Sequence, residues 1–178
     1  MPSMERDQLV QHLTPPPGVV MPPYPAARDR WYRWSLLAAA LGFFGQGIAT
    51  LAANRDAIAF FHGWLAIALA SAGWTFLVWL RNWRYLVRGL VTVGLLLWPW
   101  WTLGSWALTL SASAVMTAKE THCFHFPAGR IIPWYSLALG AALILGRPEW
   151  LIGCGWLGLA TLWGWLVWGR LHLPLFEI

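Results

Sequence analysis

The charged residues of this chain are clustered, and they leave five long windows that contain no Asp, Glu, Lys or Arg. These windows cover residues 34–53, 57–80, 89–118, 131–146 and 150–169. A helix rises about 1.5 Å per residue, so about 20 apolar residues cross a hydrocarbon core of about 30 Å. Four of the windows therefore predict single membrane-spanning helices. Because their hydrophobicity is continuous and does not alternate, a β-barrel is disfavoured.

Composition agrees that lipid is the solvent of this chain. Of its 178 residues, 11% are charged and 58% are hydrophobic, and 16 are Trp. An ordinary soluble domain is about 25% charged. The 12 basic and seven acidic side chains are too few to coat a globule of this length. The composition thus excludes a soluble enzyme, a disordered chain and a nucleic-acid-binding domain.

The window 89–118 admits two interpretations. It is too long for one span and slightly short for two, since two spans need about 34 residues and a turn. Its centre reads Leu-Trp-Pro-Trp-Trp at 97–101. Pro99 disfavours a continuous helix, and Trp is enriched at membrane interfaces. We interpret this segment as a tight hairpin whose arms run over 83–98 and 101–124; the alternative is one long helix kinked at Pro99.

The distribution of basic residues favours six spans over five. With six spans and both termini in the cytoplasm, ten basic residues lie inside and two lie outside. With five spans the division is eight to four. The fold class predicted is therefore all-α, a polytopic membrane protein with six transmembrane helices arranged as three tight hairpins. The alternative has five helices with a Pro-kinked third. The inside set under the six-span prediction is Arg6, Arg28, Arg30, Arg33, Arg81, Arg84, Arg88, Lys119, Arg130 and Arg170; the outside set is Arg55 and Arg147.

Three regions are expected along the chain. Residues 1–27 hold seven of the 12 prolines and are predicted to be a disordered, Pro-rich cytoplasmic tail. Residues 28–170 form a single transmembrane helical domain, and 171–178 form a short C-terminal tail. The Pro-rich segment is interpreted as a tether rather than as an interaction ligand, because short Pro motifs are weak signals.

The densest polar segment, residues 119–126, closes the predicted fourth span. Glu120, His122, Cys123 and His125 could be metal ligands, but their spacing divides them between two helix faces. Cys123 could act as a nucleophile with a neighbouring His, although no orienting acid or oxyanion hole is evident. The default interpretation is structural. Lys119 then reaches lipid phosphates and Glu120 pairs with an arginine of the 81–88 loop, while His122 and His125 sit at the interface.

The run Lys119-Glu120-x-x-Cys123-Phe124 looks like the signature of a known family. The chain also has a basic-aromatic entry at 28–33, an aromatic-basic loop at 81–88 and two spans after the run. With these features it resembles a family of uncharacterised bacterial integral membrane proteins that is common in cyanobacteria. The likeness covers about residues 28–170. The chain departs from the family pattern in two places: its region of the third and fourth spans is shorter, and His122 and His125 are not part of the pattern. The resemblance implies no activity, and it marks Lys119, Glu120, Cys123 and Phe124 as the candidate functional motif.

Few other polar residues lie within the predicted spans. Gln46, among Gly42, Gly45 and Gly47, is expected to bond across a close helix contact. His62 is placed near the outer interface, where it is a weak candidate ligand for haem or chlorophyll. In the last span, the glycines are expected to form one small face that packs on another helix, and the Trp face is expected to turn toward lipid or a partner. Cys123 and Cys154 lie near opposite faces, so no disulfide is expected.

The function these patterns favour is non-catalytic. We expect an interaction, assembly or scaffolding component of a bacterial plasma membrane, or of a thylakoid membrane if the chain is cyanobacterial, because no buried charge and no convincing ligand cluster is foreseen. The expected partners are the lipid bilayer and other membrane proteins, and no nucleic acid. No cofactor, metal or catalytic residue is predicted. The alternatives are a small-solute channel or transporter and, third, a pigment- or metal-binding membrane protein.

Overall fold

The part of the chain that the computed structural model describes is all-α. It comprises residues 7–8, 11, 14–15, 17–19, 23–78 and 80–175, and no strand occurs among them. The predicted fold class is confirmed at this level. The six helices are α2 (Ala26–Leu51), α3 (Arg55–Thr75), α4 (Arg81–Leu97), α5 (Thr102–Phe124), α6 (Ala128–Ile144) and α7 (Glu149–Leu171).

Three of these helices, α2, α3 and α7, are long and apolar enough to cross a membrane. The helices α4 and α6 have 17 residues each, which corresponds to about 25 Å, less than the hydrocarbon core. The helix α5 has 23 residues, but Ser and Thr recur along it. By length and composition, α2, α3 and α7 are therefore candidate spans.

The segment 89–118 is divided between two helices. The helix α4 ends at Leu97, the turn Trp98–Trp101 contains Pro99, and α5 begins at Thr102. Within the turn, the backbone N–H of Trp101 donates to the carbonyl of Leu97 at 2.7 Å. The two helices then pack against each other. The hairpin prediction is confirmed, and the alternative of one Pro-kinked helix is wrong.

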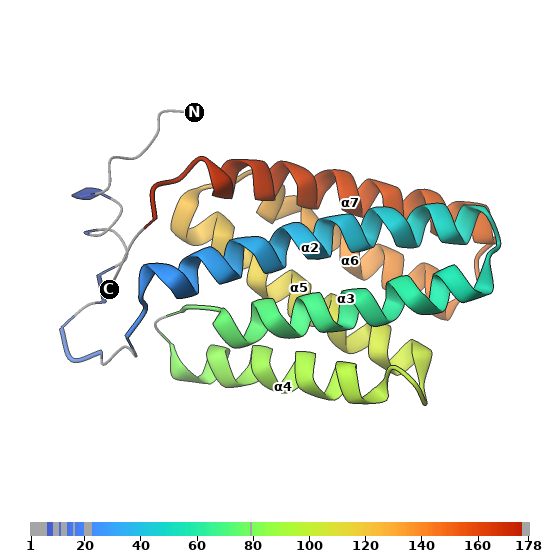
Figure 1. Cartoon of the computed structure of the whole chain (residues 1–178), viewed down its shortest axis with the longest axis horizontal. Coiled ribbons are helices and arrows are strands. Elements are labelled where there is room, and N and C mark those ends of the chain that lie inside the picture. Colours follow the sequence, from blue (N-terminus) through green and yellow to red (C-terminus); the bar gives the residue numbers. More distant parts are fainter. Residues whose placement is uncertain are drawn as a thin grey trace.

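Successive helices run in opposite directions and lie side by side in one bundle (Figure 1). Short turns at 52–54, 98–101 and 145–148 close the three hairpins at one end. The other end collects the start of α2, the links 76–80 and 125–127, and the end of α7 (Figure 1). We call these the turn end and the link end. The helix α2 makes the most extensive contacts, with α7 on one side and α3 on the other.

Glycines explain how closely α2 approaches its neighbours. A Cβ on Gly45 would overlap the ring of Phe61 in α3, and one on Gly47 would overlap Leu157 in α7. Small residues permit such close packing of helices in lipid. The predicted role of these glycines is confirmed, whereas the expected cross-helix bond of Gln46 is not seen: its buried Oε1 has no hydrogen-bond partner within the described part of the chain.

Aromatic side chains fill the space between α2, α5 and α7. Trp156 and Trp163 of α7 are 1% and 0% exposed, and their rings lie 5.9 Å and 5.4 Å from that of Phe43 in α2. The expectation that the tryptophans of the last span face outward is wrong for these two. It holds for Trp165 and Trp168, which are 51% and 66% exposed.

The glycines of α7 also depart from the single small face that was expected. A Cβ on Gly153 would meet Leu51 of α2, while Cβ atoms on Gly155 and Gly158 would meet Leu139 and Tyr135 of α6. Gly164 has nothing within 4 Å. The reason is that α7 packs against two neighbours, so small residues are needed on two sides and large rings fill the side between them.

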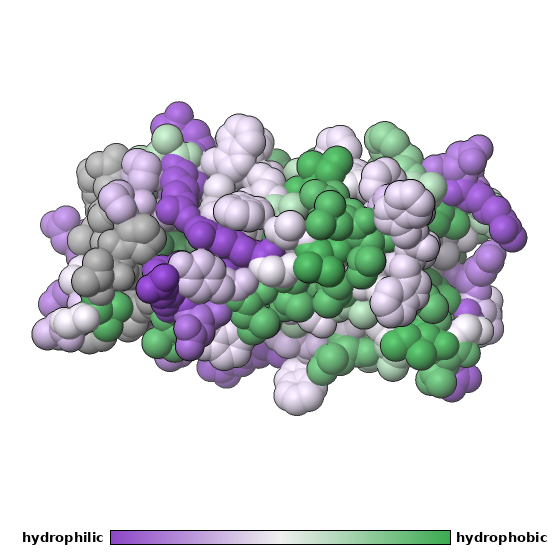
Figure 2. All heavy atoms as spheres, turned by 90° about the horizontal axis from the view of Figure 1, so that it is seen from below, coloured by the Kyte–Doolittle hydropathy of each residue, from purple (hydrophilic) through white to green (hydrophobic). Residues whose placement is uncertain are grey.

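One face of the bundle is banded. Figure 2 shows apolar residues gathered in the middle of one face and hydrophilic residues at both of its ends. Large exposed aromatic side chains include Trp100 and Trp101 near the turn end and Trp31 and Trp34 near the link end. An apolar belt between aromatic and polar ends is the surface that a bilayer solvates.

The chain before α2 is described only in part. The predicted tail 1–27 and Arg6 lie largely or wholly outside the described residues, as do the last three residues, 176–178. Within the tail, Tyr24 is 1% exposed, and the guanidinium of Arg28 lies 5.2 Å from its ring centre. This burial raises the pKa of the Tyr24 hydroxyl above its ordinary value. The residues just before α2 therefore pack against the bundle.

Candidate functional site: a buried charge cluster at the link end

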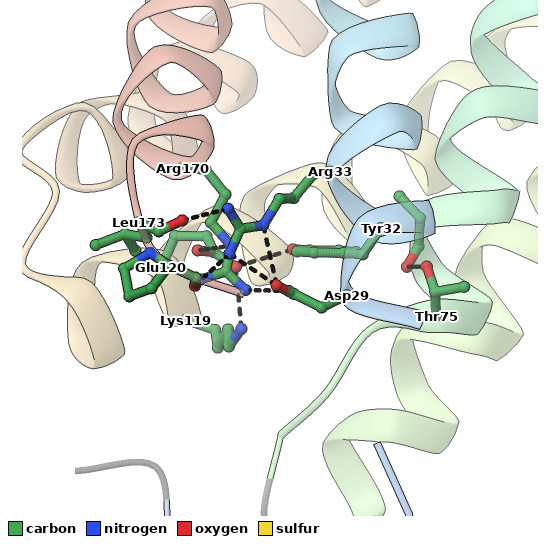
Figure 3. Close-up of polar contacts among 10 residues, drawn as sticks. Asp29, Tyr32, Arg33, Thr75, Lys119, Glu120, Arg170 and Leu173 are labelled. Atoms are coloured by element: carbon green, nitrogen blue, oxygen red, sulfur yellow. Dashed lines mark hydrogen bonds and ion pairs between the residues drawn. The ribbon is translucent and has the colours of Figure 1, made fainter. Parts of the chain in front are cut away.

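Five charged side chains meet inside the link end of the bundle (Figure 3). They come from the start of α2, the end of α5 and the end of α7. Four of them have side chains no more than 6% exposed, and the fifth, Lys119, is 8% exposed. We call this set the buried charge cluster; its members are Asp29, Arg33, Lys119, Glu120 and Arg170.

Asp29 is the centre of the first half of the cluster. Its Oδ1 accepts from Nη2 of Arg170 at 2.8 Å. Its Oδ2 lies 2.7 Å from Nη2 of Arg33 and accepts from Nε of that residue at 3.0 Å. Arg33 follows Asp29 by one helical turn, so both side chains lie on one face of α2. The first turn of a helix also favours a carboxylate, as the last turn of α7 favours Arg170.

Glu120 is the centre of the second half. Its Oε1 accepts from Nζ of Lys119 at 3.0 Å and from the hydroxyl of Tyr32, also at 3.0 Å. Its Oε2 lies 3.7 Å from Nε of Arg170. Arg170 thus contacts both carboxylates and connects the two halves. A carboxylate near the C-terminus of a helix opposes the helix dipole, so these cations also offset an unfavourable position.

Two parts of the structural interpretation of this segment are wrong. Glu120 pairs with Lys119 and Arg170, and with no arginine of the 81–88 segment. Lys119 does not extend outward to lipid phosphates. Its Nζ lies 5.0 to 5.7 Å from the ring centres of Tyr32, Phe76 and Phe124. The cause is the position of α7, whose Arg170 brings a second cation to Glu120 inside the bundle.

Aromatic rings lie against two cations of the cluster, Lys119 and Arg170. The guanidinium of Arg170 lies 4.1 Å from the centre of the Phe124 ring and 5.9 Å from that of Tyr32. The faces of aromatic rings attract cations, and the attraction is stronger where water is excluded. Phe124, 5% exposed, follows Glu120 by one turn of α5. This gives the Lys-Glu-x-x-x-Phe spacing a physical role: Lys119 and Glu120 contact residues of α2 and α7, and the Phe124 ring covers them.

Arg33 also holds the residues that follow α7. Its Nη1 donates to the carbonyl of Leu173 at 2.6 Å, and its Nη2 donates to that of Pro174 at 2.7 Å. These two carbonyls come directly after the last helix, where helix geometry leaves acceptors without intrahelical partners. The guanidinium of Arg33 therefore links Asp29 in α2 to the segment that follows α7.

The histidines and Cys123 of the 119–126 segment do not belong to this cluster, although Cys123 lies near Lys119, Glu120 and Arg170. His122 and His125 are exposed, and Cys123 is half-buried. His125 ends α5 with a left-handed backbone, φ 56°. Both cysteines are free thiols. Among the residues that the structure describes, no group of three or more His, Cys, Asp or Glu side chains could hold a metal ion.

His62 is a packing residue of the α3–α5 contact. It is 2% exposed, its ring stacks on that of Trp106 at 3.8 Å, and its Nε2 shares a hydrogen bond of 2.9 Å with Oγ of Ser105. A haem or chlorophyll ligand would need that nitrogen and open space beside it. Here Nε2 is engaged by Ser105 and the ring is covered by Trp106, which disfavours ligation. The expected depth of His62 near the outer interface stays a prediction.

The sequence interpretation missed Tyr32 and Arg170 as partners of Glu120. It also missed the ion pairs of Asp29 with Arg33 and Arg170, so its expectation of no buried charge is wrong. A charge-free window shows where charges are absent, but it does not show whether the charges at its edges face water. One signal was present: Asp29 is the single acid within the basic run 28–33. Comparison with protein families, with curated proteins and with solved structures found no match.

Proposed function

We propose that this protein is an integral component of a bacterial membrane that acts through interaction, assembly or scaffolding rather than through catalysis. The observation that carries the proposal is the mutual pairing of the buried charge cluster, in which each of the two carboxylates contacts two cations. Its carboxylates and cations bond to one another, to the Tyr32 hydroxyl and to backbone carbonyls. A catalytic or transport site instead needs polar groups that reach a substrate.

The outer surface supports the same proposal. Large apolar side chains project from every helix, and several are tryptophans that are more than half exposed: Trp31, Trp34, Trp74, Trp100, Trp101, Trp134, Trp150, Trp165 and Trp168. Trp is favoured both at membrane interfaces and at protein–protein contacts. The clustered charged side chains thus lie inside the bundle, and large aromatic side chains project from its surface.

All six helices span the membrane in this proposal. The helices α4, α5 and α6 lie alongside α2, α3 and α7 in one bundle (Figure 1). A short apolar helix such as α6 is accommodated by local thinning of the bilayer or by anchoring at its flanks. For α4 the flanking Trp98–Trp101 turn supplies such an anchor.

The proposed orientation places the link end and both termini in the cytoplasm. In the described part of the chain, the turn end carries the basic residues Arg55 and Arg147, and the remaining basic residues lie toward the link end. The positive-inside rule then assigns the link end to the cytoplasm. The resemblance to an uncharacterised bacterial membrane family is consistent with this location and stays a prediction.

Site-specific photo-crosslinking in the native membrane tests the interaction role. A photo-reactive residue at Trp168 or Trp134 of the full chain should give a discrete adduct of defined mass from at least one position. The matched control is Leu96, which is exposed to a similar extent, 65% against 66% for Trp168. The proposal fails if all three positions yield lipid adducts alone.

Two further measurements distinguish the alternatives. Purified protein in liposomes should pass small solutes no faster than empty vesicles do, and faster flux would identify a channel or transporter. The purified protein should show no visible absorption and no bound metal, whereas a stoichiometric pigment or metal would identify the third candidate. Turnover of a substrate that is lost in a Cys123→Ser variant would overturn the non-catalytic proposal.

A further inference from the structure

Three arginines outside the buried charge cluster converge on the C-terminus of α3. Arg28 of α2 and Arg88 of α4 both donate to the carbonyl of Trp74, each at 3.3 Å. Arg84 of α4 donates to the carbonyl of Val78 at 3.1 Å. The negative end of the α3 dipole accounts for part of this attraction. Two helices thus place three guanidiniums around one helix end.

These guanidiniums lack an acidic counterpart. No ion pair joins any of the three to a carboxylate within the described residues. Among the residues described within the helices at the link end, the acids Asp29 and Glu120 are enclosed in the buried charge cluster. Arg84 and Arg88 instead lie close enough to Arg28 for their charges to repel it. The positive charge gathered here is therefore suited to attract an anion from outside the described chain.

Much donor capacity also stays available at this place. Each guanidinium has five N–H donors, while the contacts above use one or two of them in each residue. The Nε of Arg88 is buried and has no hydrogen-bond partner in the part of the chain described here. Planar guanidiniums bind phosphate oxygens through paired N–H···O bonds.

The surroundings fix the level of this site in the membrane. The guanidinium of Arg88 lies 5.2 Å from the centre of the Trp74 ring, and Trp74, Trp83 and Tyr85 are 55%, 44% and 55% exposed. Such exposed Trp and Tyr side chains mark the headgroup level of a bilayer. On the face of the bundle that Figure 2 presents, a hydrophilic run extends from one end toward the apolar middle.

We propose that Arg28, Arg84 and Arg88 form a binding site for the phosphate of an anionic phospholipid headgroup, on the link side between α2, α3 and α4. The phosphodiester accepts hydrogen bonds from Arg84 and Arg88, and Arg28 supplies a third positive charge from the opposite side of the α3 terminus. A net negative lipid is preferred over a zwitterionic one because three cations meet there. The proposal rests on the membrane location but not on the scaffolding role.

Native mass spectrometry of the full chain tests this site. Protein released from nanodiscs of mixed phosphatidylglycerol and phosphatidylcholine should retain phosphatidylglycerol preferentially. An Arg84→Gln/Arg88→Gln variant should bind it about tenfold more weakly, because charge-assisted bonds are lost. An Arg55→Gln/Arg147→Gln variant, which removes two exposed arginines at the turn end, should bind it as the wild type does.

Several outcomes would overturn the proposal. Equal retention of the two lipids by the wild-type protein overturns it without any variant, so misfolding of a variant cannot hide a failure. Equal loss in the turn-end variant would show nonspecific attraction to positive charge. Inorganic phosphate that stabilises the wild type in phosphatidylcholine nanodiscs as well as phosphatidylglycerol does would reassign the site to a soluble anion. Failure of membrane insertion is detected separately, by the cysteine labelling described below.

Discussion

Asp29 in the first turn of α2 and Arg170 in the last turn of α7 form an ion pair of 2.8 Å, although 141 positions separate them in sequence. Their side chains are 0% and 1% exposed. The first and last helices of the bundle are thus joined by buried opposite charges. Leaving one such charge without its partner is costly, while pairing both offsets the cost of removing them from water.

Replacing Asp29 should destabilise the bundle strongly. Asp29→Asn leaves Arg33 and Arg170 buried without this carboxylate, so we expect a loss of about 3–5 kcal/mol in the free energy of unfolding. Thermal unfolding of the purified protein in detergent measures the change. Asp56→Asn is the matched control, since Asp56 also occupies a first helical turn but is exposed. Equal shifts for the two variants would contradict a buried role for Asp29.

Removing the Tyr32 hydroxyl should have a smaller effect than removing the charge of Glu120. Tyr32→Phe keeps the ring beside Lys119 and deletes one hydrogen bond to Oε1 of Glu120, so a loss of about 1–3 kcal/mol is expected. Glu120→Gln should lose more, because Lys119 and Arg170 then lose a negative partner. The same unfolding assay compares them. If Tyr32→Phe costs as much as Glu120→Gln, the hydroxyl has a role beyond this bond.

Two glycine substitutions should shift stability in opposite directions. Gly45→Ala places a methyl group against the Phe61 ring, and such overpacking costs about 1–3 kcal/mol. Gly164→Ala meets nothing within 4 Å, and the higher helix propensity of Ala should stabilise it by up to about 1 kcal/mol. Melting temperatures of both variants, prepared in parallel, measure the signs. A Gly45→Ala variant as stable as the wild type would argue against the close α2–α3 contact, and a destabilised Gly164→Ala variant would argue against open space beside Gly164.

Labelling with an impermeant thiol reagent tests the six spans and their orientation. In a Cys123→Ser/Cys154→Ser background, Arg147→Cys at the turn end should react on intact cells. Arg130→Cys at the link end should react only after the cells are permeabilised. With five spans the two positions would exchange their accessibility, as the assignment of basic residues requires.

The sequence predicted the helices and turns well for a physical reason. The windows without charge and the prolines at 99 and 148 act locally, so the ends of α2, α4 and α7 could be read from neighbouring residues. The hairpin at Pro99 followed from the same local rules. By contrast, the last span does not reveal that Trp163 is core and Trp165 is exposed, because that depends on which helices flank α7.

The candidate site could be predicted only in part. The run at 119–124 marked Lys119, Glu120, Cys123 and Phe124 as a functional motif, and that motif stays a prediction. The structure brings Lys119, Glu120 and Phe124 together. The partners of Glu120 on the other helices, Tyr32 and Arg170, lie 88 positions before it and 50 after it, on helices whose adjacency no local pattern encodes. A buried carboxylate at a helix end looks in sequence like an exposed one, and only the position of Arg170 distinguishes the two.

A double-mutant cycle between Asp29 and Arg170 tests the central claim most directly, namely that buried charges join the first and last helices. The free energies of unfolding of the wild type, Asp29→Asn, Arg170→Gln and the double variant would be measured in one detergent. The account predicts that the double variant is more stable than the two single losses imply, by about 1–3 kcal/mol. Single losses that simply add would show that the two side chains do not stabilise each other and would contradict the account.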